Sequence, residues 1–190
     1  MKTHSPEDLA AATSLVKQAM KILWGPLLNG PSMEGTPDRV VRYWAECSSG
    51  LSQDPMQPLL KQFEVASNDI VIVKGIQFQS VCEHHILPIL GTAHVAYIPT
   101  GKVVGLSKIP RAFDILCRRP QLQERLTTEM GLLLTRALKP EGVAVVVDGE
   151  HTCMTGRGIR KTGAVTRTSF MGGVFREDAS ARAEVLNLIL

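Results

Sequence analysis

Hydrophobic residues in the first quarter of the chain recur with helical spacing, which predicts two N-terminal helices. The apolar face of the first helix consists of Leu9, Ala12, Val16, Ala19 and Leu23. Ser5-Pro6-Glu7-Asp8 predicts its start, because serine caps helices and proline and acidic residues suit the first turn. Gly25-Pro26 predicts its end. Thr36-Pro37-Asp38 opens a second helix that we expect to run to about Cys47.

From about residue 70 the hydrophobic pattern changes to a period of two, which predicts β-strands. Ile70, Ile72, Ile76 and Phe78 indicate the first strand. A second strand is predicted over residues 89–98 and a shorter one over residues 102–105. Two more are predicted over residues 143–147 and 165–174.

Helical spacing returns between these two groups of strands and after the second. Ser107 is predicted to cap a helix that reaches Cys117, and Pro120 separates this helix from a longer one. The apolar side of the longer helix consists of Leu122, Leu126, Leu133 and Ala137. Asp178 is predicted to cap a last helix, which reaches the C-terminus.

The order of elements predicts an α+β fold, in which an antiparallel sheet carries a helix pair on one face. An N-terminal helical region precedes it. We expect this region to span residues 1–67 and a catalytic domain to span residues 68–190.

The composition is that of a globular protein, with 190 residues, 44% hydrophobic and 21% charged. The net charge of +3 is too weak to favour nucleic acid but is compatible with a small anionic substrate. Four dispersed cysteines without a disulfide framework, and the absence of a signal-like segment, predict a cytoplasmic protein. No apolar run is long enough to predict a membrane span.

Two short segments carry the ligand types of a zinc site: Cys82-Glu83-His84-His85 and His151-Thr152-Cys153. Cys82, His85 and Cys153 make three ligands and leave a fourth coordination position open for water, which zinc activates near neutral pH. His84 and His151 stand beside them as candidate proton carriers. If the second segment is extended, its His and Cys side chains point to the same face. The pattern is typical of hydrolytic chemistry.

Other cysteines and histidines lack such neighbours. Cys47 and Cys117 are interpreted as packing residues. His94 lies within a predicted strand, where a structural or surface imidazole is the simplest interpretation.

Three further groups are candidates for binding a substrate. Ser107 and Lys108 lie at a predicted helix N-terminus, where an anion is favoured. Alone they indicate a plain helix cap with a solvated lysine, and Arg111 one turn later favours the anion. Glu124 lies off the apolar stripe and is either solvated or an acceptor for the N1–H and amino group of guanine. The last group, either a solvated face or a phosphate site, consists of Arg157, Arg160, Lys161 and Arg167.

In their order and spacing, six segments resemble the GTP cyclohydrolase I family, over about residues 30–178. They are Thr36-Pro37-Asp38-Arg39-Val40, Cys82-Glu83-His84-His85, Gly105-Leu106-Ser107-Lys108, Gln121-Leu122-Gln123-Glu124-Arg125-Leu126-Thr127, His151-Thr152-Cys153-Met154 and Arg157-Gly158. The resemblance implies a tunnelling fold that assembles into rings, two pentamers stacked as a homodecamer, with active sites at subunit interfaces.

The resemblance also implies a role for each matching residue. The zinc ligands would be Cys82, His85 and Cys153, and the acid–base groups His84, His151 and Ser107. The ribose and triphosphate would be bound by Ser107, Lys108, Arg111, Arg157, Arg39 and Arg42. Glu124, assisted by Gln123, would hold the guanine edge. Arg42 stands where relatives often have lysine, and Gly156 where they often have a larger residue, which could loosen the Arg157 loop.

The reaction implied is the conversion of GTP and water to 7,8-dihydroneopterin triphosphate and formate, the first step of pterin and folate biosynthesis. It proceeds by hydrolytic opening of the imidazole ring, an Amadori-type rearrangement and ring closure. Three alternatives compete with it. A nitrile reductase of the same fold needs a nucleophilic cysteine and a nicotinamide cofactor, and a pyruvoyl-tetrahydropterin synthase has an all-histidine zinc site. The third is a non-catalytic, zinc-stabilised assembly module, against which the presence of His84, His151, Ser107 and Glu124 together argues.

Overall fold

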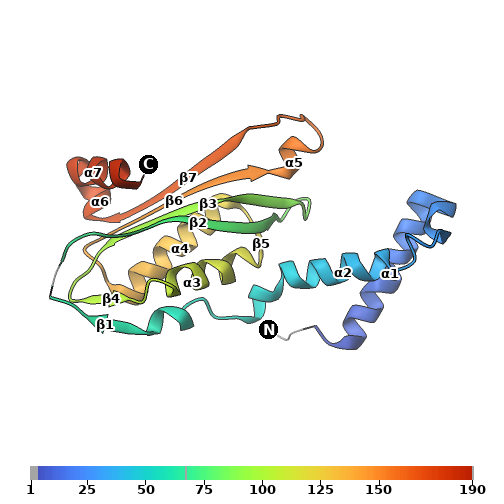
Figure 1. The fold of residues 1–190 in the computed structure, drawn as a ribbon, viewed down its shortest axis with the longest axis horizontal. Coiled ribbons are helices and arrows are strands. Elements are labelled where there is room, and N and C mark those ends of the chain that lie inside the picture. The colour runs from blue at the N-terminus through green and yellow to red at the C-terminus, as the bar shows by residue number, and fades with distance from the viewer. Residues whose placement is uncertain (1–3, 67, 190) are drawn as a thin grey trace.

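A five-stranded sheet forms the body of the chain, and a helical arm projects from one end of it (Figure 1). The structure, a computed structural model, describes residues 4–66 and 68–189. In the order in which they pair, the strands are β5 (Pro120–Gln121), β2 (Val71–Cys82), β3 (Pro88–Ile98), β6 (Gly142–His151) and β7 (Val165–Gly173). All pairs are antiparallel except the short β5–β2 pair. The architecture is mixed α+β, as predicted.

The register of β3 places the ends of two other strands side by side. Val81, near the end of β2, pairs with Pro88 at the start of β3. The next residue of β3, Ile89, pairs with His151, the last residue of β6. Since β3 runs antiparallel to both neighbours, the C-terminal ends of β2 and β6 lie at the same end of the sheet.

Helices α3 (Lys108–Cys117) and α4 (Gln123–Leu138) pack against one face of the sheet (Figure 1). Alternate residues of the central strands point into this core, as a period of two requires. The fully buried members from β3 and β6 include Ala93, Val95, Val145 and Val147. On α4, Leu126, Met130 and Leu134 recur every four residues and are fully buried, which explains why this segment forms a helix on the sheet.

Helices α6 (Val174–Glu177) and α7 (Ala179–Ile189) cover part of the other face, over Ala96, Ala144 and Val146. The predicted cap of the last helix is confirmed, since Asp178 Oδ1 accepts hydrogen bonds from the Ser180 and Ala181 amides at 2.6 and 3.3 Å.

Polar side chains follow on the same face, beyond the part covered by α6 and α7. Arg167 binds Asp148 through two bonds of 2.7 and 2.8 Å and lowers the pKa of that carboxyl group. Arg167 of β7 therefore forms an ion pair with Asp148 of the neighbouring strand β6. His94, half-buried on this face, accepts a hydrogen bond from the Gly75 amide at 3.4 Å, in agreement with a structural imidazole.

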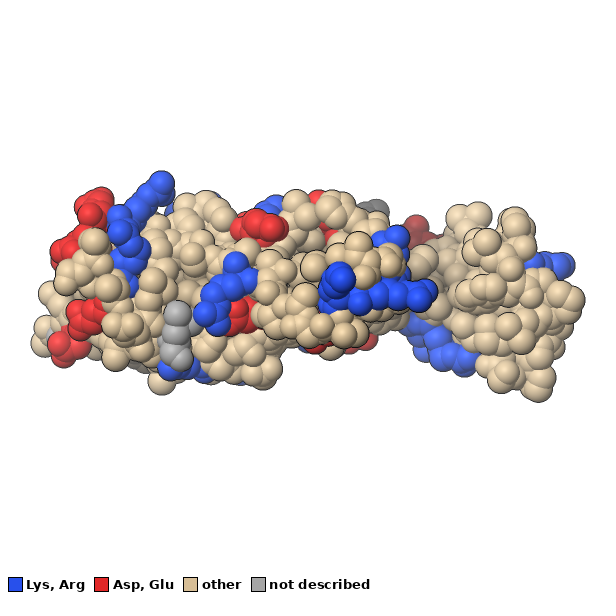
Figure 2. Space-filling model, turned by 90° about the horizontal axis from the view of Figure 1, so that it is seen from above, with Lys and Arg blue, Asp and Glu red and all other residues tan. Residues whose placement is uncertain are grey.

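The arm consists of α1 (Pro6–Trp24), the 3-10 turn η1 (Gly25–Asn29) and α2 (Thr36–Cys47). Ser5 and Asp8 form the predicted capping box, with bonds of 3.0 and 3.1 Å. The apolar side chains of the arm are largely exposed: Ile22 at 84%, Leu23 at 75% and Leu15 at 65%. In Figure 2 the visible surface of the arm carries few charges. No helix in the described ranges is long and apolar enough to cross a membrane.

Several short elements and boundaries differ from the prediction. The segment at 102–105 is β4 (Lys102–Val104), which pairs with the unpredicted β1 (Gln62–Glu64) in a separate two-stranded sheet. Two 3-10 turns, η2 (Ser49–Ser52) and η3 (Gln57–Leu60), connect the arm to β1. The β1–β4 pair crosses the expected domain boundary at residue 67, which itself lies outside the described residues. The strand predicted at 143–147 continues to His151, because Asp148, Gly149 and Glu150 still pair although they are not hydrophobic.

Helix α4 approaches β7 closely because residue 131 is glycine. A Cβ atom there would overlap the ring of Phe170. Overpacking typically costs about 1–3 kcal/mol, whereas alanine returns about 1 kcal/mol or less of helix propensity. We therefore expect Gly131→Ala to lower the free energy of unfolding, measured by urea denaturation. Phe170→Leu in the same chain should recover part of the loss, and a Gly131→Ala protein more stable than the parent would contradict this packing.

Candidate metal centre

Three predicted ligands meet where β2 and β6 end. Cys82 is the last residue of β2, His85 lies in the following turn, and Cys153 lies in the short helix α5 (Thr152–Thr155). Their donor atoms all lie within 4.8 Å of one another. Cys82 Sγ is 3.7 Å from His85 Nδ1. The Cys82 carbonyl accepts a hydrogen bond from the Ile86 amide at 2.8 Å, and this bond closes the turn.

The chemistry of the three donors fits a zinc ion, which binds thiolate sulfur and imidazole nitrogen. Burial, and then the neighbouring Cys82, raise the pKa of the Cys153 thiol. A divalent cation between the two sulfur atoms would remove that penalty, because a coordinated thiol is deprotonated. Three protein ligands are also the number found in catalytic zinc sites, which keep a fourth position open.

The loop between Cys82 and His85 is fixed from outside by an ion pair. Arg125 on α4 contacts Glu83 at 2.5 Å and also donates to Gln121 Oε1 at 3.0 Å and to the Pro120 carbonyl at 2.9 Å. The Glu83 amide donates to the Gln121 carbonyl at 3.1 Å. Sequence reasoning missed these partners, because neither Glu83 nor Arg125 has a spacing that indicates the other.

The two candidate acid–base histidines come from different segments, His84 from the turn after β2 and His151 from the end of β6. His84 is exposed, and its ring stands edge-on to that of His85, with centroids 6.2 Å apart. His151 is half-buried, and burial lowers its pKa while the Glu124 carboxylate opposes this. Residues 151–153 do not meet the condition of an extended segment, because the chain leaves β6 at His151 and turns into α5. Cys153 reaches the other ligands from this helical turn.

Gln123 and Glu124 lie at the start of α4, next to His151. Glu124 is exposed, as a base-binding carboxylate requires. Gln123 is only 1% exposed, and its side chain binds His151 and the strands β6 and β7. The expectation that the Gln123 amide assists Glu124 at the guanine edge does not match this arrangement, because the amide is already engaged inside the chain.

The predicted triphosphate residues are divided between separate regions. Arg157 lies at the centre, with Nη1 2.8 Å from His85 Nε2. Ser107, Lys108 and Arg111 lie at and just after the start of α3, next to β4, at the other end of the sheet (Figure 1). Ser107 occupies the predicted N-cap position of a helix that ends at Cys117, but its side chain makes no capping hydrogen bond.

The two remaining arginines lie on α2 in the arm. Arg39 donates to Thr36 Oγ1 at 2.8 Å and to the Ser32 carbonyl at 3.3 Å. Arg42 pairs with Asp38 at 2.8 Å. One chain therefore brings together the metal ligands, both histidines, Glu124 and Arg157, but leaves the α3 group at a distance.

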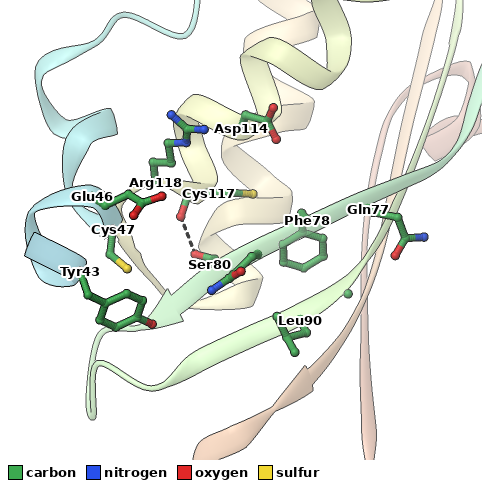
Figure 3. Close-up of a pocket in the computed structure, with 12 residues that line it drawn as sticks. Tyr43, Glu46, Cys47, Gln77, Phe78, Ser80, Leu90, Asp114, Cys117 and Arg118 are labelled. Carbon is green, nitrogen blue, oxygen red and sulfur yellow. Dashed lines mark hydrogen bonds between the residues drawn. The ribbon is translucent and has the colours of Figure 1, made fainter. Parts of the chain in front are cut away.

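A cavity of about 660 Å³ lies elsewhere, between α2, the sheet and α3 (Figure 3). It is lined by Cys47 and Cys117, and none of the predicted site residues belongs to its lining. Burial raises the pKa of Tyr43 to about 12 and also raises the pKa values of both thiols. Cys117 is 2% exposed within the core, which confirms the packing role expected of it.

The donor geometry generates a prediction about metal content. We expect about one zinc ion per chain in the purified parent protein, because two sulfurs and one imidazole converge. Cys153→Ser should lose most of this zinc, measured by elemental analysis, while Cys117→Ser should keep it as a matched control. Full zinc occupancy in Cys153→Ser would remove that residue from the ligand set.

The sequence of the chain is similar to those of known proteins. The GTP cyclohydrolase I family model matches residues 14–190. "GTP cyclohydrolase 1" of Geobacillus kaustophilus is 48% identical over 92% of this chain and 95% of its own. The proteins of the same name from Rhodopirellula baltica and Bacillus subtilis are 47% and 48% identical, over 98% and 92% of this chain and 81% and 94% of their own. Among solved structures, the apo archaeosine synthase QueF-Like aligns with a TM-score of 0.47 and 21% identity, over 56% of this chain and 96% of that one. By its sequence and over nearly its whole length, this chain belongs to the GTP cyclohydrolase I family, and it is an enzyme.

Proposed function

We propose that this enzyme is zinc-dependent and converts GTP and water to 7,8-dihydroneopterin triphosphate and formate. The observation that carries the proposal is the convergence of Cys82, His85 and Cys153 beside His151, with Glu124 next to that histidine. A hydrolytic centre and a carboxylate suited to guanine thus lie at the same end of the sheet. Family membership supports GTP as the substrate.

Zinc, when held by these three residues, would supply Lewis acidity and an activated water for attack on C8 of the purine. His151 exchanges a proton with the imidazole part of the base, since it lies two residues from Cys153 and next to the base-binding carboxylate. His84, exposed in the metal loop, and Ser107 serve the later opening of the ribose. These three side chains transfer protons to and from the substrate or hold the substrate in position.

The triphosphate is bound by residues from more than one subunit. Arg157 lies at the metal centre, whereas Lys108 and Arg111 lie toward the other end of the sheet in the same chain (Figure 1). Arg39 and Arg42 lie on α2 in the arm. A substrate at the metal centre therefore needs the α3 residues of another copy of the chain.

The sheet has two free edges that suit such an assembly. Strand β5 covers only Val81 and Cys82 of β2, and within the described part of the chain β7 pairs with β6 alone. Since β2 and β7 run in opposite directions, β7 of one copy can extend the sheet of the next in antiparallel fashion. Such a head-to-tail contact closes into a ring, and the tunnelling fold and the decamer of two stacked pentamers are the form we propose. The exposed apolar side chains of the arm supply a second contact between copies.

The direct test is incubation of the zinc-loaded protein with GTP. We expect one formate per GTP and, after oxidation, a fluorescent pterin, with neither product from ATP. Removal of zinc by a chelator should stop the reaction, and zinc should restore it. Pterin formation that persists without zinc, or no formate from GTP, would contradict the proposal.

Base specificity is expected to depend on Glu124. Guanine offers two donors, N1–H and the amino group, whereas the unprotonated N1 of adenine would face a carboxylate that only accepts. Loss of hydrogen bonds to a charged group costs roughly 1.5–3 kcal/mol, so Glu124→Ala should bind GTP about tenfold more weakly or worse in equilibrium titration. Glu124→Gln should be milder, because the amide keeps one acceptor. A Glu124→Ala protein that binds GTP like the parent and still excludes ATP would contradict this role.

The shared site predicts complementation between two inactive variants. Lys108→Ala lacks a triphosphate ligand, and Cys153→Ser lacks a metal ligand. After the two are mixed, dissociated and reassembled, some sites contain an intact Lys108 from one copy and an intact Cys153 from another. We expect partial recovery of formate release in the mixture and none in either variant treated alone. Mixed oligomers that form but stay inactive would show that both residues act within the same chain.

A further inference from the structure

Gln123 is one of the few polar side chains buried in the core of this chain, at 1% exposed. Its amide nitrogen lies within hydrogen-bond distance of three acceptors: the Val147 carbonyl at 3.0 Å, the Thr166 carbonyl at 2.8 Å and Thr168 Oγ1 at 3.2 Å. Its carbonyl oxygen lies 2.8 Å from His151 Nε2. The side chain therefore connects α4 to β6 and β7 and to His151 at the candidate site.

The orientation of this amide is fixed by its partners. Backbone carbonyls only accept, so a flipped amide would place its oxygen against those of Val147 and Thr166. The threonine partner is fixed as well, since Thr127 Oγ1 lies 2.7 Å from Thr168 Oγ1 and donates to the Gln123 carbonyl of the main chain at 2.8 Å. The atom that faces His151 is thus the amide oxygen.

Strand β6 leaves room for that oxygen by having glycine at position 149. A Cβ atom there would overlap Gln123 Oε1 and lie 3.1 Å from Ile89 Cγ2. Glycine within a strand often marks a close approach of other groups, and here the group is the carbonyl that contacts His151. Gly149 lies 26 positions from Gln123 in the sequence. Its missing side chain leaves the space in which the Gln123 carbonyl contacts His151.

The contact with Gln123 determines which ring nitrogen of His151 carries a hydrogen. A carbonyl oxygen only accepts, so His151 Nε2 carries the ring hydrogen, and Nδ1 is the nitrogen with a free electron pair. We propose that Gln123 is a positioning residue of the reaction: its carbonyl fixes the ring plane and tautomer of His151, so that Nδ1 exchanges the proton with the substrate. This inference rests on the proposed function of the site.

Two variants disturb the contact in different ways. Gln123→Met keeps the length of the side chain and removes the carbonyl, whereas Gly149→Ala keeps the amide and displaces it. A misplaced catalytic group can lower the rate on the order of 100-fold. We expect kcat for formate release to fall on that scale in both variants, while zinc content and the Kd for GTP stay as in the parent. Gly149→Ala also keeps the test valid if Gln123→Met does not fold.

The chain offers a matched control for each variant. Gln62 also donates its amide to two carbonyls, of Leu59 at 3.1 Å and Ala137 at 2.8 Å, but near the far end of α4. Gly142 lies at the far end of β6, where a Cβ would be 2.8 Å from Val174 Cγ1. Gln62→Met and Gly142→Ala should keep the parent kcat. Equal losses of kcat in these controls would overturn the inference in favour of a general packing effect.

A double variant separates positioning from stability. In the His151→Ala background, Gln123→Met should cause no further loss of kcat, because the group that it positions is gone. A full additional loss there, or parent-like kcat in both Gln123→Met and Gly149→Ala, would overturn the inference. If the parent itself releases no formate from GTP, the proposed function fails; a parent that is active beside unaffected variants contradicts only the role of Gln123.

Discussion

The antiparallel pairing of β3 with both β2 and β6 is the constraint on which the site depends. It joins Val81 to Pro88 and Ile89 to His151, and so places the end of β2 beside the end of β6. Cys82 and Cys153 come within coordination distance of the same point only because of this register. A slip of one residue would turn every side chain of a strand to the opposite face and separate the ligands.

The hydrophobic core holds that register. Ala93 and Val95 of β3 and Val145 and Val147 of β6 are fully buried against α3 and α4, so the alternative register would turn His94 and Asp148 into this core. The same packing buries Gln123, whose amide satisfies carbonyls of β6 and β7 while its oxygen contacts His151. Stability of the sheet and orientation of His151 thus share one set of contacts.

Much of this arrangement could be predicted from the sequence, because its causes are local. Periodicity placed the long helices and strands, and the Cys-x-x-His spacing placed two ligands on one turn. The helical turn at Cys153 could not be predicted, since residues 151–153 have no local preference strong enough to reveal it. Strands β1 and β5 have three and two residues and are too short for a period to show.

Roles that depend on contacts between distant segments could not be predicted from the sequence either. Gln123 has the sequence context of a surface helix start, and only the fold shows that it faces Gly149 and His151. The separation of the start of α3 from the metal centre likewise follows from the fold, because the two lie toward opposite ends of the sheet (Figure 1). The resemblance assigned both groups to one substrate, and their separation within one chain is the reason for proposing that two copies of the chain share that substrate.

X-ray absorption spectroscopy at the zinc edge of the purified, zinc-loaded protein tests most directly whether this register builds an open catalytic centre. We expect two sulfur ligands at about 2.3 Å, one imidazole nitrogen at about 2.0–2.1 Å and one further light atom that belongs to no side chain. The light-atom shell should change when GTP is added, while both sulfurs remain. Four protein ligands that stay unchanged with GTP, or only one sulfur, would contradict it.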